Sequence, residues 1–249
     1  MATLPSHNII QLPPRLDPNR RLPPLEAGDR LTREQFLERY AAMPANVKAE
    51  RIEGTVYMPA AVRAGFHGQP HALVMTWLGT FWGATPGVML ADNSTINLDL
   101  DNDPQPDACL RVLTSHGGRA KISADDYIVG APELIVEITA SSVSYDLGEK
   151  LHAYRRNGVS EYLVHRTYDG EFDWFILRGG QYQRQMPDAN GIYRSDAFPG
   201  LWLKADALIA GKVAEVLATV QQGIASTEHG AFVEKLERQR AELEKQHGS

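Results

Sequence analysis

The sequence predicts an α+β domain in which one mixed β-sheet is flanked by helices. The first observation is that short apolar strand patterns and longer helical patterns are interspersed along the chain. The second is the segment 133–139, ELIVEIT, which is the strongest strand pattern in the sequence. The third is the helical pattern from residue 205 onward, which predicts a helical C-terminal extension.

Composition narrows the class of protein. The chain has 249 residues, which is enough to bury a sizeable core in one or two domains. Its one cysteine, Cys109, excludes a disulfide scaffold and a multi-cysteine zinc site. No apolar run approaches the roughly 20 residues that cross a bilayer, and residues 1–12 lack a signal-peptide pattern. We therefore expect a cytoplasmic protein with no membrane partner.

The N-terminal part of the chain combines an extended arm with a helix and a hairpin. Residues 1–30 are proline-rich and should run extended, either as a loosely ordered tail or as an arm on a partner subunit. A Thr-x-x-Gln capping box predicts a helix over 32–42. The following patterns predict a hairpin over 49–58 that turns at Glu53-Gly54, a loop over 59–68 and a buried helix over 71–82.

The remaining elements follow the same signals. Strands are predicted over 88–91, 94–100, 108–113, 133–139, 161–166, 172–177 and 181–185. A polar connection spans 114–131. A second capping box, Asp146 with Glu149, predicts a helix over 146–156 that stops at Asn157-Gly158. Two more helices are predicted over 212–222 and 227–245.

Glu137 is the most informative polar residue. Alternation along the strand 133–139 puts it on the face opposite its two apolar neighbours, deep in an apolar segment. A carboxylate buried there needs a cation, an arginine or a metal as its partner. Lys150 lies on the rim of the apolar stripe of the next helix, where it can reach back over the sheet edge. Asp107, which precedes the strand 108–113, could converge with both.

Each of these residues also has an ordinary interpretation. Asp107 could be a turn aspartate, Glu137 a structural ion-pair residue and Lys150 a solvated surface lysine. Their order, however, resembles the PD-(D/E)XK nuclease superfamily, in which Pro-Asp precedes a strand that carries Glu and a nearby Lys.

The surrounding motifs resemble the Uma2 family of restriction-endonuclease-like proteins. They run in family order over roughly residues 30–225: Leu31–Phe36, Glu50–Gly54, His71, Gln105–Asp107, Gly130–Ile138, Asp146–Lys150, Tyr154, Gly158–Tyr162 and Phe198–Leu203. The resemblance implies a restriction-endonuclease-like core, which we place at residues 31–210. A helical extension would then occupy 211–249.

The resemblance also implies a divalent-metal phosphodiesterase that acts on DNA. Asp107 and Glu137 would ligate Mg²⁺, or Mn²⁺ in its place, and the main-chain carbonyl of Ile138 would supply a third oxygen. Lys150 would position the nucleophile and stabilise negative charge in the transition state. The superfamily pattern puts the lysine two residues after the glutamate, where this chain has Thr139. The Uma2 pattern moves the lysine to the following helix, which Lys150 fits.

Two further residues, Glu50 and His71, match the family. Each has a functional and a purely structural interpretation. Glu50 would contact a metal-bound water or Lys150, or it is an ordinary strand carboxylate. His71 would take part in catalysis, or it is a hydrogen-bonded core histidine. Asp146 is interpreted as a helix cap.

Two classes of function remain open. The first is a metal-dependent endodeoxyribonuclease, for which two-fold symmetric cutting of DNA favours a homodimer. The second is a nucleic-acid-binding or regulatory protein on a nuclease fold that has lost activity. The net charge of −6, Thr139 and the loop at Ser141-Ser142, which lacks the proline usual in the family, favour it. A metal hydrolase with another phosphoester substrate is a third possibility.

Overall fold

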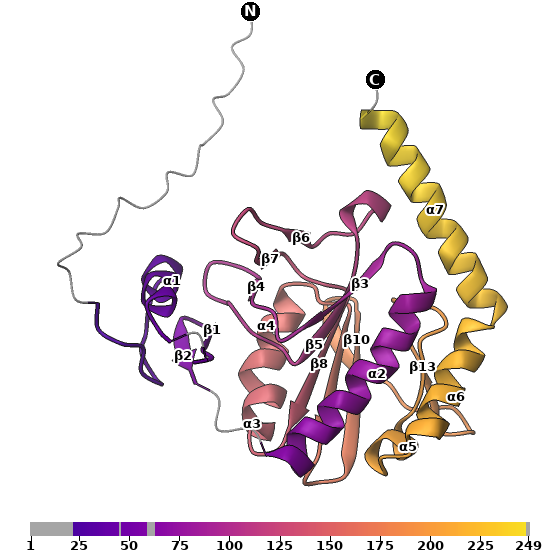
Figure 1. Ribbon diagram of the computed structural model, residues 1–249, viewed down its shortest axis with the longest axis horizontal. Coiled ribbons are helices and arrows are strands. Elements are labelled where there is room, and N and C mark those ends of the chain that lie inside the picture. Colours follow the sequence, from indigo (N-terminus) through magenta and orange to yellow (C-terminus); the bar gives the residue numbers. More distant parts are fainter. Residues whose placement is uncertain (1–21, 45, 59–62, 248–249) are drawn as a thin grey trace, which may run out of the picture.

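The main sheet of the computed structural model has six strands, and the structure describes residues 22–44, 46–58 and 63–247 (Figure 1). The strand order is β11–β10–β9–β8–β5–β3, and β8 and β9 form its parallel pair. The strands are β3 (Val88–Asp92), β5 (Ala108–Val112), β8 (Leu134–Thr139), β9 (Glu161–Arg166), β10 (Glu171–Arg178) and β11 (Gln181–Arg184). A mixed sheet flanked by helices is therefore confirmed.

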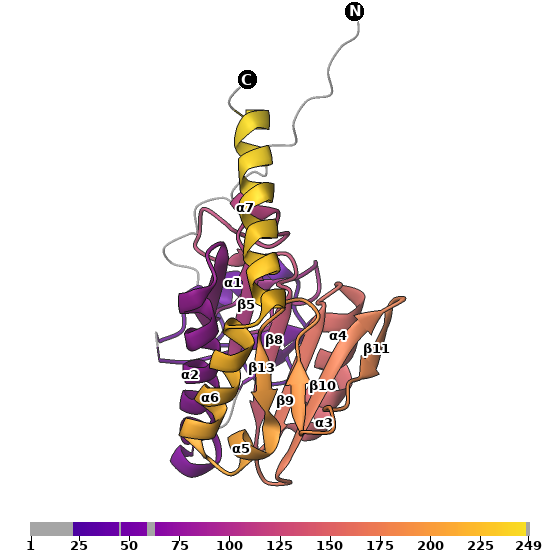
Figure 2. The same ribbon diagram turned by 90° about the vertical axis from the view of Figure 1, so that its right-hand side faces the viewer.

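Helices cover both faces of this sheet (Figure 2). On one face lie α2 (Gln69–Ala84), α5 (Ala205–Ile209) and α6 (Val213–Ile224). On the other lies the crossover from β8 to β9, which consists of α3 (Val143–Tyr145), a π-helical turn (Asp146–Lys150) and α4 (Leu151–Arg156). Two parallel neighbouring strands require such a crossover, and the crossover packs back onto the sheet.

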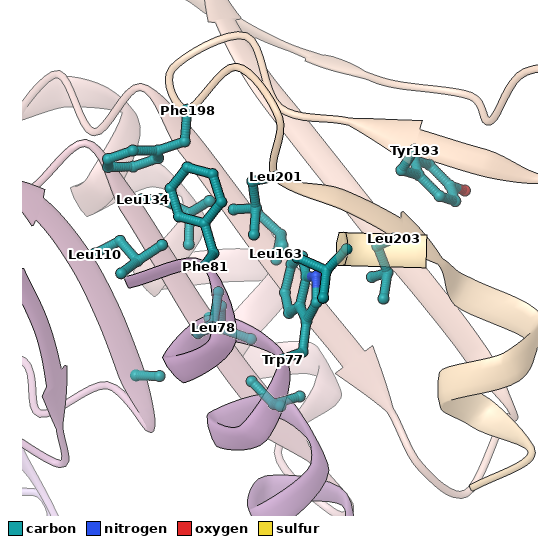
Figure 3. Close-up of a cluster of buried hydrophobic side chains, with 14 of the residues drawn as sticks. Trp77, Leu78, Phe81, Leu110, Leu134, Leu163, Tyr193, Phe198, Leu201 and Leu203 are labelled. Carbon is teal, nitrogen blue, oxygen red and sulfur yellow. The ribbon is translucent and has the colours of Figure 1, made fainter. Parts of the chain in front are cut away.

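The larger core fills the space between α2, α6 and the sheet. Figure 3 shows side chains of α2 packed against side chains of the strands, among them Trp77, Leu78, Phe81, Leu110, Leu134 and Leu163. The predicted alternation in β8 is confirmed. Leu134, Val136 and Ile138 belong to this core, whereas Ile135 belongs to the smaller core under α4. Glu137 therefore faces the crossover.

Smaller sheets and helices surround the main sheet. The predicted helix and hairpin are present as α1 (Arg33–Ala41), with its Thr32 capping box, and as β1 (Glu50–Ile52) paired with β2 (Thr55–Tyr57). The other elements are β4 (Ile96–Asn97), β6 (Lys121–Ile122), β7 (Ile128–Val129), β12 (Ile192–Arg194), β13 (Trp202–Lys204) and α7 (Thr227–His247). Helix α7 extends away from the sheet (Figure 1), and Phe232 and Leu236 anchor its first half in the larger core.

Three predictions about local structure need correction, and two predicted segments lie partly outside the described residues. The strand predicted over 94–100 is reduced to β4, which pairs with β7 outside the main sheet. The connection 114–131 contains a helical turn, Thr114–His116, as well as β6 and β7. The loop over 59–68 includes a π-helical turn, Ala64–Gly68, that leads into α2, while 59–62 lie outside the described residues. Residues 1–21 of the proline-rich arm also lie outside the described residues.

The helix predicted over 146–156 begins three residues earlier, at Val143. Asp146 has helical backbone angles, with φ −68° and ψ −37°, so it does not cap the helix. Its carboxylate accepts a hydrogen bond from the Ser142 hydroxyl at 2.6 Å and is buried. Within the described ranges, no helix combines the length and the apolar character needed to span a membrane.

Glu161 provides a test of this fold. Its Oε1 accepts hydrogen bonds from the main-chain amides of Asp196 and Ala197, and its Oε2 accepts bonds from the Trp174 indole and the Ser195 hydroxyl. Glu161→Gln would turn an amide NH₂ towards two of these donors. We expect a loss of about 1–3 kcal/mol in the free energy of unfolding, measured by urea denaturation.

The measurement belongs at pH 8.5, because burial raises the pKa of Glu161 to about 7 and the wild-type carboxyl must be ionised. Glu234→Gln, at an exposed position on α7, is the control and should change stability by less than about 0.5 kcal/mol. Equal stabilities of the two variants would contradict the prediction.

Candidate active site

A buried lysine surrounded by carboxylates lies under the crossover helix. The Nζ atom of Lys150 is 2.9 Å from Glu137 Oε1, 3.0 Å from Glu50 Oε1 and 3.6 Å from Asp146 Oδ1. The Tyr154 hydroxyl donates a second hydrogen bond to Glu137 Oε1 at 2.9 Å. The four charged side chains are at most 12% exposed, so their charges interact with little screening by water.

The local sequence explains why these side chains meet. Glu137 points from β8 towards the crossover, and Lys150 and Tyr154 are four residues apart, so they point from the same face of that helix back to the strand. Glu50 belongs to β1 and contacts the same ammonium. Its Oε2 accepts a hydrogen bond from the Gln105 amide at 3.0 Å, which ties β1 to the segment that leads into β5.

Asp107 lies opposite Glu137 at the junction of β5 and β8. These strands are antiparallel, and Ala108 pairs with Val136. One step further along the same register, Asp107 stands opposite Glu137, so both side chains rise from the same face of the sheet. The side chain of Asp107 is 13% exposed, which places it at the solvent edge of the buried cluster.

Pro106 interrupts the hydrogen-bond ladder at this point. The Thr139 carbonyl accepts a hydrogen bond from the Thr167 amide, which follows β9. Because successive residues of a strand direct their main-chain groups to opposite sides, the amide and carbonyl of Ile138 point towards β5. The register puts Pro106 opposite Ile138, and proline has no N–H to donate to that carbonyl. The Ile138 amide donates to Asp107 Oδ2 instead, at 2.6 Å.

Two histidines reach Asp107, one from the π-helical turn Ala64–Gly68 and one from the start of α2. The Nε2 atom of His67 is 3.0 Å from Asp107 Oδ1. The Nε2 atom of His71 is 3.1 Å from the main-chain oxygen of Asp107 and 3.0 Å from Asp92 Oδ1. The two rings are four residues apart and stack, with centroids 5.8 Å apart.

The structure brings most of the predicted site residues together. Glu50, Glu137 and Lys150 are in direct contact, and Asp107 lies beside them. His71 lies at the edge, where it contacts the main chain of Asp107 and not the buried cluster.

The sequence analysis assigned no role in this site to three of its residues, Asp146, Tyr154 and His67, although the first two lie in the family motifs. A signal for each was present in the spacing. Asp146 precedes Lys150 by four residues and Tyr154 follows it by four, while His67 precedes His71 by four. On a helix this spacing puts side chains next to each other.

Burial and charge perturb the ionisable groups of the cluster. Burial raises the pKa of Glu137 well above its ordinary value and raises the pKa of Glu50, although Lys150 opposes both shifts. Burial would lower the pKa of Lys150, but the adjacent carboxylates outweigh it and raise this pKa well above the ordinary value. Burial would raise the pKa of Asp107, but the hydrogen bond and charge of His67 bring it below the usual range. Lys150 is therefore held protonated.

The donor set fits a hard divalent cation that keeps most of its water. Glu137 accepts both of its hydrogen bonds at Oε1, which leaves Oε2 available among the described residues. Asp107 stands opposite it, and the Ile138 carbonyl lacks a ladder donor. Two carboxylates and one carbonyl suit Mg²⁺, which is commonly bound through one or two carboxylates and several waters. A site closed by three or more acidic, histidine or cysteine side chains is absent from the described part of the chain.

Comparisons with known proteins agree on the kind of fold. A family model, Uma2, described as "Putative restriction endonuclease", matches residues 33–206. The solved structure of a "putative nuclease belonging to DUF820" from Anabaena variabilis ATCC 29413 matches with a TM-score of 0.51 and 11% identity, covering 74% of this chain and 98% of that one. At this identity the structural likeness shows the fold alone. No curated protein matches the chain significantly.

The buried cluster predicts a specific response to removal of its cation. Lys150→Met would leave the carboxylates of Glu137, Glu50 and Asp146 without their shared partner. We expect a loss of about 3–5 kcal/mol in the free energy of unfolding, as is typical when one member of a buried ion pair is removed. Adding Glu137→Gln to this variant should recover part of the loss, because one uncompensated charge disappears.

Urea denaturation of the wild type, the two single variants and the double variant gives the coupling between Lys150 and Glu137 directly. A double variant that is less stable than Lys150→Met alone would refute the account of the cluster as a balance of charges.

Proposed function

The chain belongs to the Uma2 family, and on this premise we propose that it is a divalent-metal-dependent endonuclease that hydrolyses DNA phosphodiester bonds. The observation that carries the proposal is the arrangement of Asp107 and Glu137 on one sheet face with the buried ammonium of Lys150 beside them. Phosphodiester hydrolysis needs oxygen ligands for a metal and a positive group near the developing charge. This arrangement offers both.

Asp107, Glu137 and the Ile138 carbonyl would hold Mg²⁺, or Mn²⁺ in its place. When bound, the metal would neutralise phosphate charge and lower the pKa of a coordinated water. Lys150 supplies the fixed positive charge. Its ammonium donates to a phosphate oxygen or to the attacking water and stabilises the negative charge that develops in the transition state.

The other buried groups prepare Lys150 and Glu137 for these roles. Glu50 and Asp146 hold the ammonium from two sides and keep it protonated. The Tyr154 hydroxyl fixes Glu137 through Oε1, so that Oε2 is the atom directed to a ligand. Tight positioning of this kind reduces the reorganisation needed during the reaction.

A second candidate function is nucleic-acid binding without cleavage. The observation that favours it is that the protein satisfies Asp107 by itself, because His67 and the Ile138 amide bind its two carboxylate oxygens. Thr139 also occupies the position where the superfamily pattern has its lysine. A module of this kind would bind nucleic acid but would have no need of a metal.

A homodimer is part of the first proposal. If the protein cuts both strands of a duplex symmetrically, a C2 dimer supplies the two active sites related by a two-fold axis. Light scattering coupled to size-exclusion chromatography measures the mass directly.

The test of the proposed function combines cleavage with metal binding. The wild type should nick supercoiled plasmid in Mg²⁺ or Mn²⁺, and Glu137→Gln and Asp107→Asn should each reduce the rate at least about 100-fold. Both changes keep the shape of the side chain. The control is Glu149→Gln, an exposed position one residue from Lys150, which should cut like the wild type.

Calorimetry with Mn²⁺ separates the two candidate functions. Binding that is lost in Asp107→Asn supports the nuclease. Binding of DNA without binding of Mn²⁺ and without cleavage would contradict the nuclease proposal and support nucleic-acid binding alone. Cleavage that survives both substitutions would show that the catalytic residues lie elsewhere.

A further inference from the structure

Two exposed aromatic side chains stack on each other at the edge of the candidate active site. Phe66 lies in the π-helical turn before α2, and Tyr168 lies in the turn between β9 and β10. Their ring centroids are 4.2 Å apart and their planes differ by 21°. The Arg63 guanidinium donates to the Tyr168 hydroxyl at 3.1 Å, which fixes the pair further.

The pair remains open to solvent although it is stacked. Phe66 is 43% exposed and Tyr168 is 49% exposed. Aromatic rings that serve only to pack two segments together are normally covered, because burying their surface is what stabilises them. These two rings therefore leave a preformed aromatic surface open to solvent.

Short connections tie both rings to the carboxylates. Phe66 is adjacent to His67, whose imidazole contacts Asp107. Tyr168 follows Thr167, whose amide and hydroxyl both donate to the Thr139 carbonyl, at 2.9 and 3.2 Å. Thr139 lies two residues beyond Glu137 in β8. The aromatic pair and the carboxylates thus share one end of the sheet.

Positive charge accompanies the aromatic surface. Arg63 and Lys48 are exposed, and Lys48 lies close enough to His67 to act on its charge. A strand of nucleic acid presents phosphates to such groups and base faces to aromatic rings, which is how proteins bind single strands without sequence preference.

We infer that Phe66 and Tyr168 form a stacking platform for an unpaired nucleobase next to the phosphate in the site, so that the substrate is single-stranded or locally unpaired nucleic acid. This inference rests on the proposed function. In a duplex, neighbouring bases cover both faces of each base, and a paired strand cannot use the platform. Because every base has an aromatic face, the platform selects for strand state and not for sequence.

The test measures binding separately from cleavage. Fluorescence anisotropy with a labelled single-stranded oligonucleotide, in EDTA, should show a loss of affinity of about tenfold for Phe66→Ala and for Tyr168→Ala. Affinity for a closed duplex without free ends should change less than twofold. Tyr168→Phe keeps the ring and should bind single strands like the wild type, and thermal melting checks that each variant is folded.

Trp82→Ala is the matched control. Trp82 has the same exposure as Phe66 and lies about 20 Å from Gln69, the first residue of α2, at 1.5 Å per residue, so its removal should leave single-strand binding unchanged. Equal losses for single strands and duplex, or no loss in either alanine variant, would overturn the inference.

The proposed function and the platform can fail separately. Wild-type protein that binds single strands through the platform but cleaves nothing in Mg²⁺ or Mn²⁺ would refute the nuclease and keep the platform. Metal-dependent cleavage that is identical in the wild type and in the Phe66→Ala, Tyr168→Ala double variant, on single strands and duplex alike, would refute the platform and keep the nuclease.

Discussion

The buried ammonium of Lys150 is the interaction on which the site depends. Three carboxylates from two strands and one helix converge on it, and none of these charges would be stable alone in this interior. Their mutual attraction is strong because little water screens it. The cluster therefore fixes β1, β8 and the crossover helix relative to one another. The same contacts that hold these elements together also fix the positions of the charges in the candidate site.

A break in the sheet ladder complements this cluster. A continuous antiparallel pair would use the amide and the carbonyl of Ile138 in hydrogen bonds to the neighbouring strand. Pro106 cannot donate to that carbonyl, and the carboxylate of Asp107 accepts the amide hydrogen bond. One proline thus ends the pairing and leaves the Ile138 carbonyl without a donor from the neighbouring strand. The Pro-Asp pair therefore has a structural role in the sheet, beside the metal-binding role that we propose for Asp107.

The sequence predicted the parts of the site that follow from periodicity. Alternation in β8 placed Glu137 on the face opposite its two apolar neighbours, and helical spacing placed Lys150 within reach of it. Asp146 was misinterpreted because aspartate favours helix caps and Glu149 completes a capping box. The true start, three residues earlier, has no side-chain cap that a pattern could reveal. His67 was missed because the turn that carries it has no apolar periodicity, and its contact with Asp107 joins segments 40 residues apart.

The two faces of the sheet carry different kinds of side chain. The face under α2 and α6 carries the larger apolar core, and the face under the crossover carries the carboxylates. Those carboxylates outnumber the ammonium, so the site repels a phosphate unless another cation is present. In the proposed nuclease, metal and phosphate would therefore each strengthen the binding of the other, since such coupling is reciprocal. The aromatic platform avoids this repulsion, because stacking on a base needs no charge. It would hold a strand at the edge of the site before the metal draws the phosphate in.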